Sequence, residues 1–213
     1  MKYSVVIVAA GSGQRMKLGY NKVFYKMKNN QTVLENTVRL FDQHENCREI
    51  IVVTQKENFD LCQFNLSKPL LLVEGGATRS ESVMCGLAKV SSEYVFVHDG
   101  ARPFVSKKSL DDLCCALQRV DACILAVPCK DTIKVVEKGV ITNTPARSTL
   151  YQAQTPQAFK TELLSLAYLK AKNDPTLTDD ASCIEKYTDQ KVHIVEGDYG
   201  NIKITTQEDL KNC

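Results

Sequence analysis

Several features are missing from this sequence of 213 residues, and each absence excludes a class of protein. No apolar run approaches the roughly 20 residues that a membrane-spanning helix requires, and the N-terminus has no signal-peptide pattern. There is no low-complexity tract, and 44% of the residues are hydrophobic, which is enough for a substantial core. We therefore expect a single soluble domain over residues 1–213, located in the cytoplasm and without a membrane partner.

Cysteine is abundant, but cysteine motifs are absent. The chain has nine cysteines, which is an odd number, and none of them form a C-x-x-C pair. Cys85, Cys114 and Cys123 lie in apolar segments, where a reduced thiol behaves as a small hydrophobic side chain. We predict structural thiols in a reducing compartment rather than a zinc site or a disulfide framework.

Negative charge is missing from the N-terminal part of the chain. The first 34 residues contain no Asp or Glu but six Lys or Arg, although the net charge of the whole chain is only +2. Such a one-sided local field suits a polyphosphate anion. The near-neutral total gives no reason to expect nucleic acid as a partner.

The apolar run Ser4–Ala10 predicts a buried strand that ends in the small residues Gly11–Gly13. Small residues let backbone amides approach a ligand closely, and the cations Arg15 and Lys22 follow. The loop lacks the Gly-Lys-Ser/Thr of a P-loop, and Met16 stands where a dinucleotide fingerprint has its third glycine. We interpret it as a phosphate cradle of another kind, the alternative being an ordinary glycine turn.

Apolar strands alternate with amphipathic helices along the chain. We predict strands at Tyr3–Ala10, Glu49–Thr54, Pro69–Val73, Tyr94–Val97, Ala122–Val127 and Val192–Val195. Helices are expected near residues 32–43, 56–65, 80–90, 107–119, 157–172 and 179–187. This alternation predicts an α/β fold with a mostly parallel sheet, covered on both faces and binding ligands at the carboxyl ends of its strands.

Residues 129–152 interrupt the alternation. Thr132–Val136, a turn at Glu137–Gly139 and Val140–Thr142 predict a β-hairpin that projects from the sheet. Because an isolated two-stranded hairpin is marginal in water, we expect it to pack on a second copy of the chain. Residues 129–152 are therefore predicted to be a dimerisation arm.

The loop after the third predicted strand contains a helix start. Thr78 and Glu81 have the spacing of a capping box. A helix N-terminus beside glycine backbone and a hydroxyl, here Gly76 and Ser82, suits a base edge or an anion. The alternative is a plain cap with a solvated Arg79.

Five later residues are candidates for the site or for its support. Asp99 follows buried strand residues, and its carboxylate suits Mg²⁺ or a substrate hydroxyl, while Arg102 suits a phosphate or pairs with Asp99. His98 continues the strand, and we interpret it as a core residue rather than a general base. Thr178 is predicted to be a helix N-cap. Lys203, in a predicted short strand, reaches either solvent or a cleft that holds negative charge.

Taken in order, these segments resemble the 2-C-methyl-D-erythritol 4-phosphate cytidylyltransferase family over essentially the whole chain. The matching segments are Ala9–Met16, Asn21–Phe24, Gly75–Val83, Val97–Pro103, Asp131–Lys134, Gln154–Gln157, Thr178–Ser182 and Asn201–Lys203. The resemblance implies a single-domain, Rossmann-like nucleotidyltransferase that dimerises through its arm. It also implies the reaction of CTP and 2-C-methyl-D-erythritol 4-phosphate, with Mg²⁺, to CDP-methylerythritol and pyrophosphate.

The resemblance also assigns residues to roles. The catalytic group would be Arg15, Lys22, Arg147 and Lys203. Arg15 and Lys22 would stabilise charge on the phosphates in the transition state, and Lys203 and Arg147 would act from the acceptor side. CTP would be bound by Ala9, Ala10, Gly11, Gly13, Gly76 and Ser82. The acceptor would be bound by Asp99, Arg102, Thr132, Thr155 and Thr178, with Thr132 and Arg147 supplied by the partner subunit's arm. Asp99 is also the candidate metal ligand.

Two alternatives to this function are considered. Ribitol 5-phosphate cytidylyltransferases share the framework, but usually carry Pro-Lys-Gln where this chain has Asn21–Val23, and Gly100 and Ala101 also favour the erythritol enzyme. A nucleotide-binding regulator without catalysis is disfavoured because four residues are all present, namely Arg15, Lys22, Asp99 and Lys203.

Overall fold

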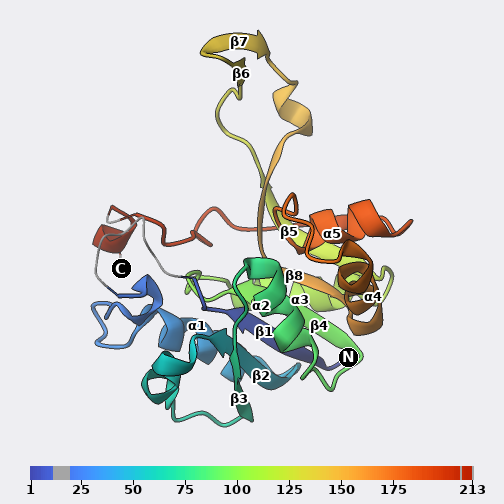
Figure 1. The fold of residues 1–213 in the computed structure, drawn as a ribbon. Coiled ribbons are helices and arrows are strands. Elements are labelled where there is room, and N and C mark those ends of the chain that lie inside the picture. The colour runs from blue at the N-terminus through green and yellow to red at the C-terminus, as the bar shows by residue number, and fades with distance from the viewer. Residues whose placement is uncertain (12–19, 207, 213) are drawn as a thin grey trace.

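The computed structural model describes residues 1–11, 20–206 and 208–212, and its centre is a seven-stranded sheet in the order β3-β2-β1-β4-β8-β5-β9 (Figure 1). Strand β8 is antiparallel to its neighbours β4 and β5, and the other neighbouring pairs in the sheet are parallel. The predicted mostly parallel sheet is confirmed. The strands are β1 Tyr3–Val8, β2 Cys47–Thr54, β3 Leu70–Glu74, β4 Tyr94–Asp99, β5 Ala122–Pro128, β8 Tyr151–Lys160 and β9 His193–Glu196.

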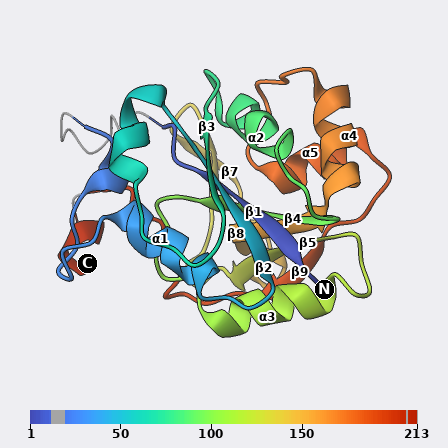
Figure 2. The ribbon, with the colours of Figure 1, turned by 90° about the horizontal axis from the view of Figure 1, so that it is seen from below.

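Helices cover both faces of this sheet, as Figure 2 shows: α1 and α3 lie on one side, and α2, α4 and α5 on the other. The α-helices are α1 Val33–Asp42, α2 Arg79–Leu87, α3 Lys107–Ala116, α4 Thr161–Ala171 and α5 Asp180–Tyr187. Short 3-10 helices occur at η2 Lys22–Phe24, η3 Lys56–Cys62, η4 Arg147–Thr149 and η5 Asp209–Asn212.

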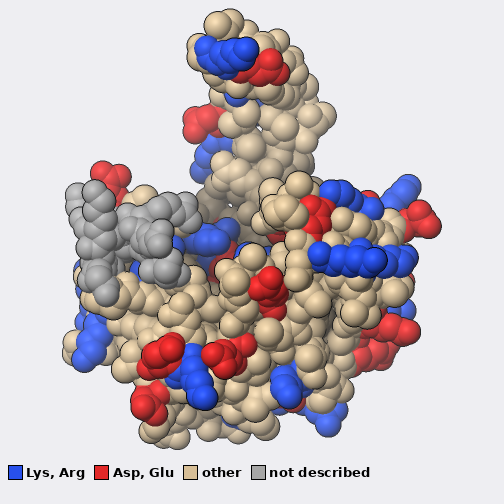
Figure 3. All heavy atoms as spheres, in the orientation of Figure 1, with Lys and Arg blue, Asp and Glu red and all other residues tan. Residues whose placement is uncertain are grey.

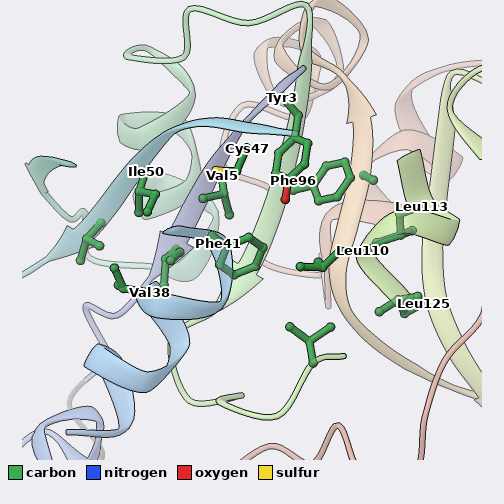
Figure 4. Packing of buried hydrophobic residues seen from close by; sticks show 14 of the residues in the cluster. Tyr3, Val5, Val38, Phe41, Cys47, Ile50, Phe96, Leu110, Leu113 and Leu125 are labelled. Atoms are coloured by element: carbon green, nitrogen blue, oxygen red, sulfur yellow. The ribbon is translucent and has the colours of Figure 1, made fainter. Parts of the chain in front are cut away.

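The alternation of side chains along β1 builds two cores, one on each face. Tyr3, Val5 and Ile7 belong to the cluster shared with α1 and α3, whereas Val6 packs with α2, α4 and α5. The ring of Tyr3 stacks on that of Phe96 with centroids 3.8 Å apart (Figure 4). Because both faces are covered, β1 and β5 are mainly apolar. The antiparallel strand β8 differs, because it carries the buried polar residues Gln154, Thr155 and Gln157.

Three predicted elements are corrected by the structure. The helix expected over 157–172 begins only at Thr161, because Gln157–Phe159 still pair with both β4 and β5 as part of β8. The helix expected over 56–65 is the 3-10 helix η3, in which only Cys62 is buried, too little for an apolar helix face. The segment around Lys203, expected to be a strand, has no regular secondary structure and lies outside the sheet.

The predicted hairpin is confirmed. Strands β6 (Val135–Glu137) and β7 (Val140–Asn143) form a separate two-stranded sheet that projects from the body of the molecule (Figure 1). Lys138 and Gly139 connect them with φ of 49° and 82°, so both turn residues are left-handed, as a tight two-residue hairpin turn requires. Figure 3 shows that most of the arm's surface is uncharged.

Candidate active site

A cavity of about 440 Å³ lies at the carboxyl ends of β1 and β4, where the sequence predicted a ligand site. Eight of the predicted site residues line it: Ala9, Ala10, Gly11, Lys22, Gly76, Ser82, Asp99 and Lys203. The other eight lining residues were not among the predicted site residues, and they include Asn21, Ala77, Thr78 and Arg79.

Asn21 fixes the start of η2 beside the end of β1. Its side-chain amide donates to the carbonyl of Ala9 at 2.7 Å, and its Oδ1 accepts from the backbone N–H of Val23 at 3.3 Å. These two bonds place Lys22, the residue between them, at the edge of the cavity. Asn21 is the N-cap of η2, a position that asparagine favours, although the sequence singles it out only within a segment that matches the family.

The opposite wall is the N-terminus of α2. The predicted capping box is confirmed, with Thr78 accepting from the N–H of Glu81 and the Glu81 carboxylate accepting from the N–H of Thr78. At Gly75 a Cβ atom would lie 2.6 Å from Ala10 Cβ and 3.0 Å from Ser82 Oγ, so the loop approaches β1 only because this residue has no side chain. The positive end of the α2 dipole therefore faces the cavity.

Three cations surround the carboxylate of Asp99. Lys203 Nζ lies 2.8 Å and Arg102 Nε 3.5 Å from its Oδ2, and Arg79 Nε lies 3.7 Å from its Oδ1. Burial raises the pKa of Asp99, but Lys203, Arg79 and Arg102 outweigh it and hold the pKa well below its usual range. Asp99 is thus ionised at neutral pH, and Lys203 faces negative charge in a cleft, as one of the two predicted alternatives required.

Buried polar groups hold Asp99 from behind. The hydroxyl of Thr155 accepts from the Asp99 N–H at 3.0 Å and lies 3.1 Å from His98 Nδ1. His98 Nε2 lies 3.0 Å from the carbonyl of Arg102, which only accepts, so Nε2 carries the proton and Nδ1 accepts from Thr155. Burial lowers the pKa of His98 to about 4. His98 is a buried, neutral core residue, as the sequence indicated.

The segment after β9 carries Lys203 to the same place. The N–H of Ile204 donates to the carbonyl of Ala101 at 2.9 Å, and the Ile204 side chain is fully buried. The carbonyl of Asn201 accepts from Arg102 at 2.7 Å, and the Asn201 amide donates to the carbonyl of Thr155 at 2.9 Å. The residues Asn201 and Ile204 on either side of Lys203 are therefore bound to the body of the protein, and they fix the position of Lys203.

Arg79 is the principal residue that the sequence reasoning missed. It donates to both carboxylate oxygens of Asp180, at 3.1 Å and 2.7 Å, and is therefore paired rather than solvated. Its partner lies 101 residues further along the chain, so spacing gave no signal for the pair. The sequence does indicate that the surrounding segment is a helix start suited to a base edge or an anion, but it leaves Arg79 as a solvated side chain in the alternative interpretation.

Other predicted residues lie outside the cavity. Thr178 is exposed, and the N-cap of α5 is Asp179, whose carboxylate accepts from the N–H of Ser182 at 2.9 Å, so the predicted cap was wrong by one residue. Thr132 and Arg147 are exposed on the arm, where Arg147 donates to the carbonyl of Lys130 at 3.1 Å.

Two further predicted residues, Gly13 and Arg15, lie outside the described residues.

The protein groups alone do not fit a metal ion. Within the described part of the chain, no three His, Cys, Asp or Glu side chains are grouped to hold one. Both oxygens of Asp99 face cations, so this carboxylate is a poor metal ligand in this arrangement. Mg²⁺ at phosphate-transfer sites is usually held by water and substrate phosphates with one or two carboxylates.

Comparison with known proteins decides the family. Residues 3–213 match the family model described as 2-C-methyl-D-erythritol 4-phosphate cytidylyltransferase. The chain belongs to this family. A relative of the same name from Bacillus velezensis is 46% identical over 99% of this chain and 93% of its own length. One from Bacillus licheniformis is 42% identical over the same shares.

Solved structures agree. The 4-diphosphocytidyl-2C-methyl-D-erythritol synthase of Anaerococcus prevotii matches with a TM-score of 0.86 and 36% identity, over 99% of this chain and 93% of that one. The 2-C-methyl-D-erythritol 4-phosphate cytidylyltransferase of Francisella tularensis matches with a TM-score of 0.85 and 33% identity, over 100% and 98%. The chain is accordingly a cytidylyltransferase of the non-mevalonate isoprenoid pathway, with the α/β nucleotidyltransferase fold. None of the helices described is both long and apolar enough to span a membrane.

Proposed function

We propose that this chain joins CTP and 2-C-methyl-D-erythritol 4-phosphate in the cavity at the ends of β1 and β4, releasing pyrophosphate. The observation that carries the proposal is the convergence of Lys22, Arg79 and Lys203 on one cavity that also holds the ionised Asp99. Two polyanions must meet in this reaction, and cations from separate loops oppose their repulsion.

The chemistry needs no strong general base. An oxygen of the acceptor phosphate, already anionic, attacks the α-phosphorus of CTP, and the bond from that phosphorus to the bridging oxygen of the β-phosphate breaks. The bridging oxygen leaves with pyrophosphate. Catalysis then consists of holding the two phosphates in line and stabilising the charge that develops. In this scheme Arg15 and Lys22 stabilise the transferring α-phosphate, with Lys203 and the partner's arm on the acceptor side.

CTP would lie along the backbone of Ala9–Gly13 and against the N-terminus of α2 at Gly76 and Ser82. Backbone amides and the dipole of α2 suit its phosphates. Since the Ser82 hydroxyl donates to the carbonyl of Thr78 at 2.9 Å, it remains an acceptor for an amino group of a base.

The acceptor would lie beside Asp99. The ionised carboxylate accepts hydrogen bonds from hydroxyl groups of the polyol, and Thr155 acts on this side by holding the Asp99 backbone. Arg102 and Thr178 complete the acceptor side of the proposal.

Mg²⁺ is the proposed metal, held by the triphosphate rather than by a cluster of protein carboxylates. When bound it neutralises phosphate charge and orients the triphosphate. In this proposal Asp99 binds the acceptor and does not bind the metal.

We propose further that residues 129–152 are the dimerisation arm of a single domain. The side chains of Val140 and Ile141 are 66% and 59% exposed on the arm, apolar surface that a second protomer would cover. Arg147 and Thr132 would then reach the partner's cavity.

The arm exchange is tested by mixing two inactive variants, Lys22→Ala and Arg147→Ala, under conditions that permit subunit exchange. If Arg147 serves the neighbouring cavity, one site of each heterodimer has both defects and the other has none. Up to half of the heterodimer's sites then recover. Should Arg147 serve its own cavity, every site keeps one defect and mixing restores nothing.

The reaction is tested by incubating the chain with CTP and Mg²⁺ and either methylerythritol phosphate or ribitol phosphate, and following pyrophosphate. We expect much faster release with methylerythritol phosphate. Equal or faster release with ribitol phosphate would overturn the choice of acceptor, and no release with either would overturn catalysis.

A cytoplasmic location is proposed from the thiols. Eight cysteines are free in the described part of the chain, and five of them are buried. Burial raises the pKa of Cys123 to about 12, which keeps this thiol protonated and unreactive. Such thiols suit a reducing compartment.

A further inference from the structure

The first residues of two helices meet beside the cavity. Arg79 begins α2 and Asp180 begins α5, and the guanidinium binds both oxygens of the carboxylate, at 3.1 Å and 2.7 Å. Burial alone would lower the pKa of Arg79, but Asp180 and Asp99 raise it above its ordinary value. The two hydrogen bonds and the ion pair between Arg79 and Asp180 join the first residues of α2 and α5.

Asp180 is held rigidly. Its side chain is fully buried, and the hydroxyl of Tyr168 on α4 donates to its Oδ1 at 2.6 Å. The side chain of Gln157 on β8 fixes the helix start, accepting from the N–H of Ala181 at 2.9 Å and donating to Asp179 at 2.8 Å. A guanidinium bound to such a carboxylate has one available orientation.

That orientation holds Arg79 at ion-pair distance from Asp99 but short of a hydrogen bond. Arg79 Nε lies 3.7 Å from Asp99 Oδ1, which is beyond hydrogen-bond distance, while its two terminal nitrogens are occupied by Asp180. We infer that Asp180 is a positioning residue that keeps Arg79 from closing on Asp99 and so leaves an Asp99 oxygen for the acceptor. This inference rests on the proposed role of Asp99 in acceptor binding.

The first test is Asp180→Asn, which keeps the size of the side chain and removes its charge. Arg79 then turns to Asp99, the nearest remaining carboxylate, and competes with the hydroxyl groups of the acceptor. We expect KM for methylerythritol phosphate to rise about tenfold, the loss of one charge-assisted hydrogen bond, and KM for CTP to change less than about twofold. Equal changes in both KM values, or none, would overturn the inference.

Asp174→Asn is the matched control. Asp174 pairs with Lys186 of α5 and accepts from the Tyr187 hydroxyl at 2.8 Å, but it does not line the cavity. Both variants weaken the attachment of α5 and lower the melting temperature, whereas only Asp180→Asn changes the acceptor KM. A similar rise in KM with Asp174→Asn would show that the effect is merely structural.

A double-mutant cycle with Arg79→Gln tests whether the effect of Asp180 on the acceptor depends on Arg79. If Asp180 acts through Arg79, adding Asp180→Asn to Arg79→Gln leaves the acceptor KM unchanged. A further tenfold rise in the double variant would mean that Asp180 acts elsewhere and would refute the proposal.

Arg79→Lys covers the case in which Asp180→Asn does not fold. A single ammonium group cannot bind both oxygens of Asp180 at once, so it exchanges between Asp180 and Asp99. We therefore expect the acceptor KM to rise severalfold. An unchanged acceptor KM contradicts the inference.

A crystal structure of the Asp180→Asn protein gives a readout that does not depend on turnover. We expect Arg79 to donate to Asp99 within 3.5 Å. If Arg79 keeps its present place, the positioning role of Asp180 is wrong, whether or not the proposed reaction holds.

Discussion

The cavity and the arm differ in where their side chains find partners. In the cavity, Lys203 and Arg79 are paired with buried carboxylates, and the surrounding side chains come from five regions of the same chain. On the arm, Val140 and Ile141 are exposed, and Arg147 contacts the carbonyl of Lys130. The cavity is built within one chain, while the arm has a surface suited to another.

This contrast has a physical basis in chain topology. The parallel strands bring distant loops to one edge of the sheet, where each loop finds partners in the others. The arm leaves the body after β5 and returns to it at β8, and the side chains of its two strands are exposed. Changes in the cavity should therefore alter chemistry and leave assembly intact, and changes on the arm should first alter assembly.

The largest effect is expected for Lys22→Ala. A charge aimed at the transferring phosphate acts mainly in the transition state, so kcat should fall about a hundredfold or more, about 3 kcal/mol, while KM for CTP changes little. Steady-state kinetics measure both constants. Lys26→Ala, an exposed lysine four residues away, is the control and should keep full activity. A change confined to KM would make Lys22 a ground-state binder.

Next in size is the pH dependence due to His98, which lies under the cavity floor. Its pKa is about 4 in the folded protein and about 6.5 in the unfolded chain, so the unfolded state binds more protons between these values. The free energy of unfolding should therefore fall by about 3 kcal/mol as the pH is lowered from 7 to 4. Denaturant unfolding at several pH values measures this slope.

His98→Gln should flatten that slope, because the amide still donates to the Arg102 carbonyl and does not titrate. His193→Gln is the control, since His193 is exposed on the edge strand β9 and its replacement should keep the slope. An unchanged slope with His98→Gln would show that another group titrates.

The smallest effect is expected for Val140→Ser combined with Ile141→Ser on the arm. Both side chains are exposed in the protomer, so its melting temperature should hardly change, whereas the dissociation constant of the proposed dimer should rise at least about tenfold. Sedimentation over a range of concentrations measures it. Leu169→Ser, on the 67% exposed Leu169 of α4, should leave assembly unchanged. If the arm variant leaves the dissociation constant unchanged, the arm is not the surface that joins two protomers.

Much of the fold and part of the site could be predicted from local patterns. Period-two and period-3.6 apolar spacing found the parallel strands and most helices, but it assigned Gln157–Phe159 to a helix, because a strand buried on both faces has no alternation to reveal it. Turn chemistry found the hairpin at Lys138 and Gly139. The capping box at Thr78 was also correct, while the cap of α5 was misplaced by one residue.

The sequence by itself determined the elements that depend on near neighbours: the apolar strand before the glycine loop, the capped start of α2 and the projecting hairpin. Only the tertiary structure decided which charges meet. Arg79 and Asp180 are separated by 101 residues, and Asp99 and Lys203 also come from distant loops. Such pairs leave no periodic trace in the sequence, because their contact arises from the order of the strands and the shared edge at which their loops end.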